Sequence, residues 1–265
     1  IKTYTTADGL VSNRISRIVR DSRGYLWFCT ENGLSRFDGS RFVNYTVDQG
    51  LPDDEVNDLL ETRSGAYWIA TGKGLVRYNP KGLPLPYGKA SLRSDPMFAV
   101  YRVGAERITS VIKAPYEDRS GTIWIGTWRG LFRLELAGDQ ARFHFIDLGS
   151  DPHFVRNILE DRKGALWLTT DSGLYRRRPD GTVDRFTRDH GYPSERLMGL
   201  IVDRKGNLWV GDRFGGLYLL VSDPGVSRPV VARQYATKDG LDCVRVGALY
   251  EATDGRIWIG ADCGL

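Results

Sequence analysis

The chain has 265 residues, of which 41% are hydrophobic and 26% are charged, and its formal net charge is +4. No block of Lys and Arg and no basic helix accompanies this small charge, so nucleic acid is not an expected partner. No window approaches the ~18 apolar residues of a membrane span, and Ile1-Lys2-Thr3-Tyr4 does not read as a signal peptide. We therefore expect a segment of a longer protein that does not itself insert into the membrane.

One phrase recurs along the chain and indicates a repeat architecture. A glycine stands three residues before each central tryptophan, and a Gly-Leu pair follows six or seven residues after it. The first copy reads GYLWFCTENGL and the fourth GALWLTTDSGL. The repeated tryptophans are Trp27, Trp68, Trp124, Trp167, Trp209 and Trp258.

The first unit shows the expected elements in chain order. An apolar run, Ile15–Val19, predicts a first strand, and a turn with Gly24 follows it. The segment around Trp27 is the second strand, and a further glycine turn leads into the third strand, 33–37. The aromatic segment 41–45 is the fourth strand. Glycine recurs at these turns because they require a positive φ, which costs other residues about 1 kcal/mol or more.

Later units repeat the same order with fixed spacing. The runs 166–170 and 197–202 predict a second and a first strand. An aromatic residue precedes the tryptophan by 23 positions in five units, and in the fourth unit His144 takes that place. The aromatic residues are Tyr4, Tyr45, Tyr101, Phe186 and Tyr235. Four short antiparallel strands per unit without helical periodicity predict an all-β protein, a β-propeller with four-stranded blades.

Six units are visible, and the last is truncated. The sixth stops at Gly264-Leu265, where its third strand should begin, and Ile1–Thr6 is predicted to be a fourth strand without preceding strands. The tryptophans are expected to fill the space between blades. Trp128 stands outside the repeat in an exposed turn and is a candidate for ligand contact. The units span approximately 1–37, 38–78, 97–134, 142–177, 183–220 and 230–265, with an inserted Pro-rich loop at 80–96.

The repeated phrase, with an Asp three residues before the first glycine, resembles the two-component regulator propeller repeat. Residues 118–127 and 203–211 are close copies, and Asp8-Gly9-Leu10 and Asp239-Gly240-Leu241 match its lead-in. The third unit lacks the lead-in, and Thr62 and Ala252 replace the turn Asp. The resemblance implies the periplasmic or extracellular sensor region of a membrane-anchored bacterial protein, part of a seven-bladed propeller. It also implies an oligosaccharide or other small polar ligand, a histidine kinase or similar output, and a second copy of the parent sensor as partner.

Ligand contacts are expected on the face where each first strand starts, here called the leading face, because loops carry function more often than packed blades. Arg14, Arg196 and Arg245 occupy equivalent positions there, and forked guanidinium groups suit carboxylates, sulfates and sugar hydroxyls. Phe154 and Trp128 on the same face would contact a sugar ring. The alternative is that these arginines are solvated charges, paired with neighbours such as Glu195 or Asp242.

Other side chains receive structural or competing interpretations. Cys243 and Cys263 are predicted to form a disulfide within the sixth unit, and Cys29 to be a buried thiol. No cofactor, metal site or catalytic residue is expected. A propeller lyase or glycosidase is the enzyme alternative, but His144, His153 and His190 stand beside no repeated carboxylate pair. A protein-interaction platform of the WD type ranks lower, since no tryptophan is followed by Asp.

Overall fold

The computed structural model describes residues 4–83, 96–104, 111–138, 140–149, 154–188, 192, 196–221 and 229–261. The chain divides into two compact units, residues 1–145 and 146–265, and each is described by itself. Among the described residues, no helix combines the length and the apolar character that a membrane crossing needs.

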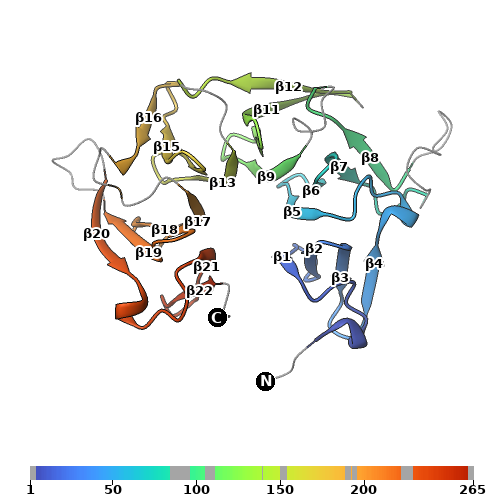
Figure 1. Cartoon of the computed structure of the whole chain (residues 1–265). Helices are drawn as coiled ribbons and strands as arrows, with labels where there is room; N and C mark the ends of the chain where they lie inside the picture. Colours follow the sequence, from blue (N-terminus) through green and yellow to red (C-terminus); the bar gives the residue numbers. More distant parts are fainter. Residues whose placement is uncertain are drawn as a thin grey trace. The chain divides into compact units, whose positions relative to one another are not determined.

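The described part of unit 1 contains three four-stranded antiparallel sheets (Figure 1). Each first strand packs against the first two strands of the sheet before it, as in neighbouring propeller blades. Blade one consists of β1 (Ile15–Arg20), β2 (Leu26–Thr30), β3 (Gly33–Phe37) and β4 (Phe42–Tyr45). Blade two consists of β5 (Val56–Glu61), β6 (Tyr67–Thr71), β7 (Gly74–Tyr78) and β8 (Phe98–Tyr101). Blade three consists of β9 (Ile112–Glu117), β10 (Ile123–Thr127), β11 (Gly130–Ala137) and β12 (Gln140–Ile146).

Unit 2 repeats this plan in its described residues with two four-stranded sheets and one two-stranded sheet. Blade four consists of β13 (Val155–Glu160), β14 (Leu166–Thr170), β15 (Leu174–Arg177) and β16 (Val183–Phe186). Blade five consists of β17 (Leu197–Val202), β18 (Leu208–Asp212), β19 (Leu217–Val221) and β20 (Val230–Tyr235). The two-stranded sheet consists of β21 (Val246–Glu251) and β22 (Ile257–Ala261).

The all-β propeller fold with four-stranded antiparallel blades is thus confirmed. The described residues form five such blades and a two-stranded sheet, so a count of six or seven blades stays a prediction. The inserted segment 84–95 and residues 262–265 lie outside the described residues.

The prediction of a fourth strand at Ile1–Thr6 is wrong for its described part. Thr6–Asp8 forms a short 3-10 helix instead, because Asp8 and Thr5 cap each other's backbone and Gly9 closes the turn with φ 101°. The same device precedes β5 at Val47–Gln49. The lead-in motif is therefore a helical cap rather than a strand end.

The turn after each first strand depends on the aspartate three residues before its glycine. In blade one, Asp21 Oδ1 accepts from the backbone N–H groups of Arg23 and Tyr25, and Oδ2 accepts from the indole Nε1–H of Trp27 at 2.9 Å. Gly24 completes the turn with φ 90°. The same indole bond joins Asp118 to Trp124, Asp161 to Trp167 and Asp203 to Trp209.

Blade two shows what the aspartate contributes. Thr62 Oγ1 accepts from the Ala66 N–H at 3.0 Å and so replaces only one carboxylate oxygen. The Trp68 Nε1 atom is buried and has no hydrogen-bond partner among the described residues. A buried, unpaired N–H group costs about 1–3 kcal/mol, so this blade keeps the turn and loses the indole bond.

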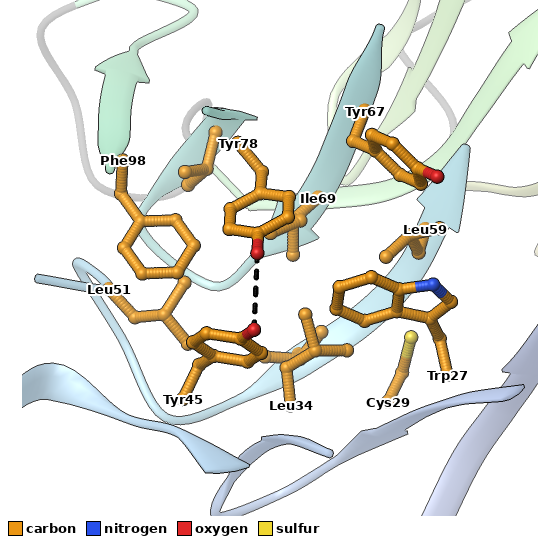
Figure 2. Packing of buried hydrophobic residues seen from close by; sticks show 12 residues of the cluster. Trp27, Cys29, Leu34, Tyr45, Leu51, Leu59, Tyr67, Ile69, Tyr78 and Phe98 are labelled. Carbon is orange, nitrogen blue, oxygen red and sulfur yellow. Dashed lines mark hydrogen bonds between the residues drawn. The ribbon is translucent and has the colours of Figure 1, made fainter. Parts of the chain in front are cut away.

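The tryptophan of blade one fills the space between blades one and two. Trp27 is 1% exposed, and its ring centroid lies 5.8 Å from that of Tyr67 and 5.6 Å from that of Tyr78. Figure 2 shows these rings together with Tyr45, whose hydroxyl lies 3.1 Å from that of Tyr78. Trp68, Trp124 and Trp167 are also buried, Trp209 is half-buried, and Trp258 of the two-stranded sheet is 46% exposed.

Neighbouring blades are also joined at their turns. Ser22 donates its backbone N–H and its hydroxyl to Glu61 at the end of β5, at 2.7 and 2.6 Å. The Arg63 N–H donates in the same way to Glu117, and the Arg204 N–H donates to Glu251. The turn residues in these blades thus connect consecutive blades through backbone donors that would otherwise need water.

Candidate functional site

The leading face is built from two segments in each blade, the start of the first strand and the turn between the second and third strands. Backbone hydrogen bonds hold them together: Gly72 N–H donates to Glu55 O at 3.2 Å, and Arg213 N–H donates to Arg196 O at 3.1 Å. Side chains at these two places therefore lie close together.

Two of the predicted site residues belong to unit 1. Arg14 has an 82% exposed side chain and forms an ion pair with Glu31 at 2.8 Å within blade one. Trp128 is 48% exposed in the turn of blade three, and its N–H donates to Val111 O. The roles of Arg14 and Trp128 in ligand binding stay predictions.

The turn of blade five differs from the turns of the other blades. Thr30, Thr71, Thr127 and Thr170 each donate a hydroxyl hydrogen bond to a glycine carbonyl, whereas blade five has Asp212 at this position. The turn is also one residue longer, with Gly215 and Gly216 before the third strand.

Asp212 holds this longer turn open. It is fully buried, and its Oδ1 accepts from the N–H groups of Phe214 and Gly215 at 2.6 and 2.8 Å. Phe214 is 60% exposed at the tip. The guanidinium carbon of Arg213 lies 5.5 Å from its ring centroid, and that of Arg196 lies 5.8 Å away. An aromatic ring with two arginines beside it is thus presented to solvent.

The same turn brings a third arginine into this region. The Gly216 N–H donates to the carbonyl of Val244 at 2.8 Å, and Val244 directly precedes Arg245. Arg196 and Arg245 are exposed, and Arg213 is half-buried. Arg196 and Arg245, which occupy equivalent positions in the repeat, are therefore linked to one turn.

Blade four contributes Phe154 and Arg156. The Phe154 N–H donates to Asp171, and the Arg156 guanidinium carbon lies 3.9 Å from the Phe154 ring centroid. Burial lowers the pKa of Arg156, and the positive charges of Arg213, Arg245 and Arg196 lower it further against the opposing effect of Asp171. Four arginines thus act on one another at this face of unit 2. We call Phe154, Arg156, Arg196, Arg213, Phe214 and Arg245 the arginine cluster.

Sequence reasoning missed three members of the arginine cluster. Arg213 and Phe214 carry a visible signal, since the phrase GDRFGGL is one residue longer than its counterparts and has Asp where others have Thr or Ala. Arg156 carries no such signal, because many strand positions in this chain are occupied by arginine.

The other predicted candidates lie elsewhere. His144 is half-buried on β12 and lies 2.6 Å from Glu135 on β11. No group of three or more His, Cys, Asp or Glu side chains in the described ranges is arranged to hold a metal ion. Cys29 is a buried free thiol, and burial raises its pKa. His153, His190, Glu195 and Cys263 lie outside the described residues, so the disulfide of Cys263 with Cys243 stays a prediction.

Comparison with known families identifies the repeat. Residues 9–32 and 50–73 match the model of the two component regulator propeller. In those two segments the chain is similar to this repeat family. These segments run from the lead-in of blades one and two to the turn after the tryptophan strand. No curated protein matches the chain.

Solved structures share the fold of this chain. Virginiamycin B lyase from Staphylococcus aureus aligns with a TM-score of 0.66 at 15% identity, covering 91% of this chain and 75% of the lyase. The extracellular domain of a hybrid two component system from B. thetaiotaomicron aligns with a TM-score of 0.58 at 19% identity, over 95% of this chain and 37% of that one. The extracellular domain of a second hybrid two component system from B. thetaiotaomicron aligns with a TM-score of 0.52 at 21% identity, and the alignment covers 98% of this chain and 40% of that one. At these identities the alignments show the propeller fold alone.

Proposed function

We propose that this chain is part of the extracytoplasmic sensor region of a two-component signalling protein and binds an oligosaccharide or other small polar ligand. The arginine cluster on the leading face of unit 2 carries the proposal. Forked guanidinium groups bind carboxylates, sulfates and hydroxyls, and exposed aromatic rings pack against sugar rings. The repeat family supports the signalling context. A C-terminal output domain, such as a histidine kinase, and a dimeric parent protein belong to the same proposal.

The test is binding of neutral and acidic oligosaccharides by the purified chain, measured by isothermal titration calorimetry. We expect at least one class to bind without being degraded, and the double variant Arg196→Ala/Arg245→Ala to bind it at least tenfold more weakly. Arg41→Ala is the matched control, because Arg41 is an exposed arginine that pairs with Asp38 on another turn. Failure of every oligosaccharide to bind, or equal loss in the control, would refute the site. Degradation of the bound sugar would show an enzyme instead.

A further inference from the structure

Backbone hydrogen bonds and the buried Asp212 side chain hold the turn that carries Arg213 and Phe214. Asp212 is 0% exposed, and its Oδ1 accepts hydrogen bonds from two backbone N–H groups of its own turn. The turn is also fastened to the carbonyls of Arg196 and Val244. The backbone of Arg213 and Phe214 therefore occupies a defined position beside Arg196.

One member of the cluster has an unmet hydrogen-bonding need. The Nε atom of Arg156 is buried and has no hydrogen-bond partner in the part of the chain that the structure describes. A guanidinium group bears five N–H donors and no acceptor, so Arg156 can pair only with acceptor groups. The Phe154 ring packs against the guanidinium group of Arg156.

Three acidic side chains lie near the cluster. Asp171 accepts the Phe154 N–H, and Asp212 Oδ1 accepts from its own turn, while the buried Asp212 Oδ2 has no hydrogen-bond partner among the described residues. Asp242 is exposed on the segment that leads to Arg245. The cluster thus has four positive charges for three acidic groups. The charges of Arg196, Arg213 and Arg245 lower the pKa of Arg156, whereas the charge of Asp171 acts in the opposite direction. This excess of positive charge favours an anionic ligand.

We infer that the ligand of the arginine cluster carries at least two anionic oxygen groups, carboxylates or sulfates, on a saccharide. The inference rests on the proposed function and deepens it. One anionic group would bind between Arg213 and Arg196 beside Phe214, and a second would bind Arg156 beside Phe154. The two aromatic rings would contact the apolar faces of the sugar units between the anionic groups.

The probes are a tetrameric oligogalacturonide, a chondroitin sulfate tetrasaccharide and the carboxyl-reduced form of the oligogalacturonide. The reduced form has the same length and linkage without charge. We expect at least one acidic probe to bind, the reduced form not to bind, and the affinity to fall as salt is added. The two acidic probes distinguish carboxylate from sulfate as the preferred group.

Variants of Arg213 test the geometry, because its backbone N–H, and not its side chain, holds the turn. We expect Arg213→Ala to weaken binding of the acidic probe by about 10- to 100-fold. Arg213→Lys should recover little of the lost affinity, since an ammonium group lacks the forked pair of N–H donors of a guanidinium group. The control Arg41→Ala should bind the acidic probe normally. All variants should keep the wild-type melting temperature. Equal binding of the reduced and acidic tetramers would overturn the inference and leave the proposed function standing. Failure of every oligosaccharide would remove both.

Discussion

Replacing Asp21 by alanine tests the central device of the repeat, the carboxylate that joins a turn to the tryptophan between two blades. In the folded protein its Oδ2 accepts from the Trp27 indole at 2.9 Å and from the Tyr67 hydroxyl at 3.0 Å. Both rings are almost fully buried, at 1% and 2% exposure. Alanine would leave both buried donors without this acceptor.

The magnitude follows from counting the donors. An unpaired buried donor costs about 1–3 kcal/mol, so the two together give a loss of about 2–6 kcal/mol in the free energy of unfolding. The two backbone bonds from Arg23 and Tyr25 to Oδ1 add to this in the turn. Asp38 is the matched control, because it accepts similar bonds from Ser40 and Arg41 in an exposed turn and contacts no buried donor.

The assay is urea unfolding followed by tryptophan fluorescence for the wild type, Asp21→Ala and Asp38→Ala. We expect Asp38→Ala to lose less than about 1 kcal/mol, as exposed turn bonds do. Equal losses in the two variants would refute the idea that the buried indole and phenol donors make Asp21 special.

The pH dependence of stability gives a second readout of the same carboxylate. Burial by itself would raise the pKa of Asp21, but the bonds from Trp27, Tyr67 and two backbone N–H groups outweigh it and lower the pKa below 3.8. Its contribution to stability is therefore complete above about pH 4 and is lost as the pH falls through the lowered pKa. The difference in stability between the wild type and Asp21→Asn should shrink below that pH. A constant difference down to pH 2 would contradict this.

Two further changes test other parts of the repeat. Thr62→Asp would give the buried Trp68 indole the acceptor it lacks and should stabilise the protein by about 1 kcal/mol, visible as a higher melting temperature; a lower one would show that the carboxylate does not fit. Glu61→Ala removes both bonds from Ser22 and should cost about 1–2 kcal/mol in urea unfolding. Ser22→Ala keeps the backbone bond to Glu61 and should therefore lower the free energy of unfolding by less than Glu61→Ala does. A larger loss in Ser22→Ala would show that the Ser22 hydroxyl, and not the backbone N–H, supplies most of the stabilisation.

The sequence by itself determined the blade architecture. Glycine, aspartate and tryptophan recur at spacings that one four-stranded sheet requires, and interactions within about 25 residues set those spacings. The strands predicted at 33–37, 166–170 and 197–202 agree with the structure. The strand predicted at Ile1–Thr6 failed in its described part because the side-chain cap of Asp8 competes with sheet pairing there.

Only the tertiary structure decided which arginines lie together. Arg196 and Arg245 are equivalent in the repeat, and within unit 2 both are linked by backbone hydrogen bonds to the turn of blade five, which adds Arg213. Arg156 is about 40–90 residues away from Arg196, Arg213 and Arg245 in the sequence, and the packing of neighbouring blades brings it close enough for their charges to act on it. The spacing of residues within one repeat does not reveal such a contact between blades. The buried Asp212 positions Phe214 by bonds to backbone N–H groups, and their direction depends on a turn conformation that exists only in the folded blade.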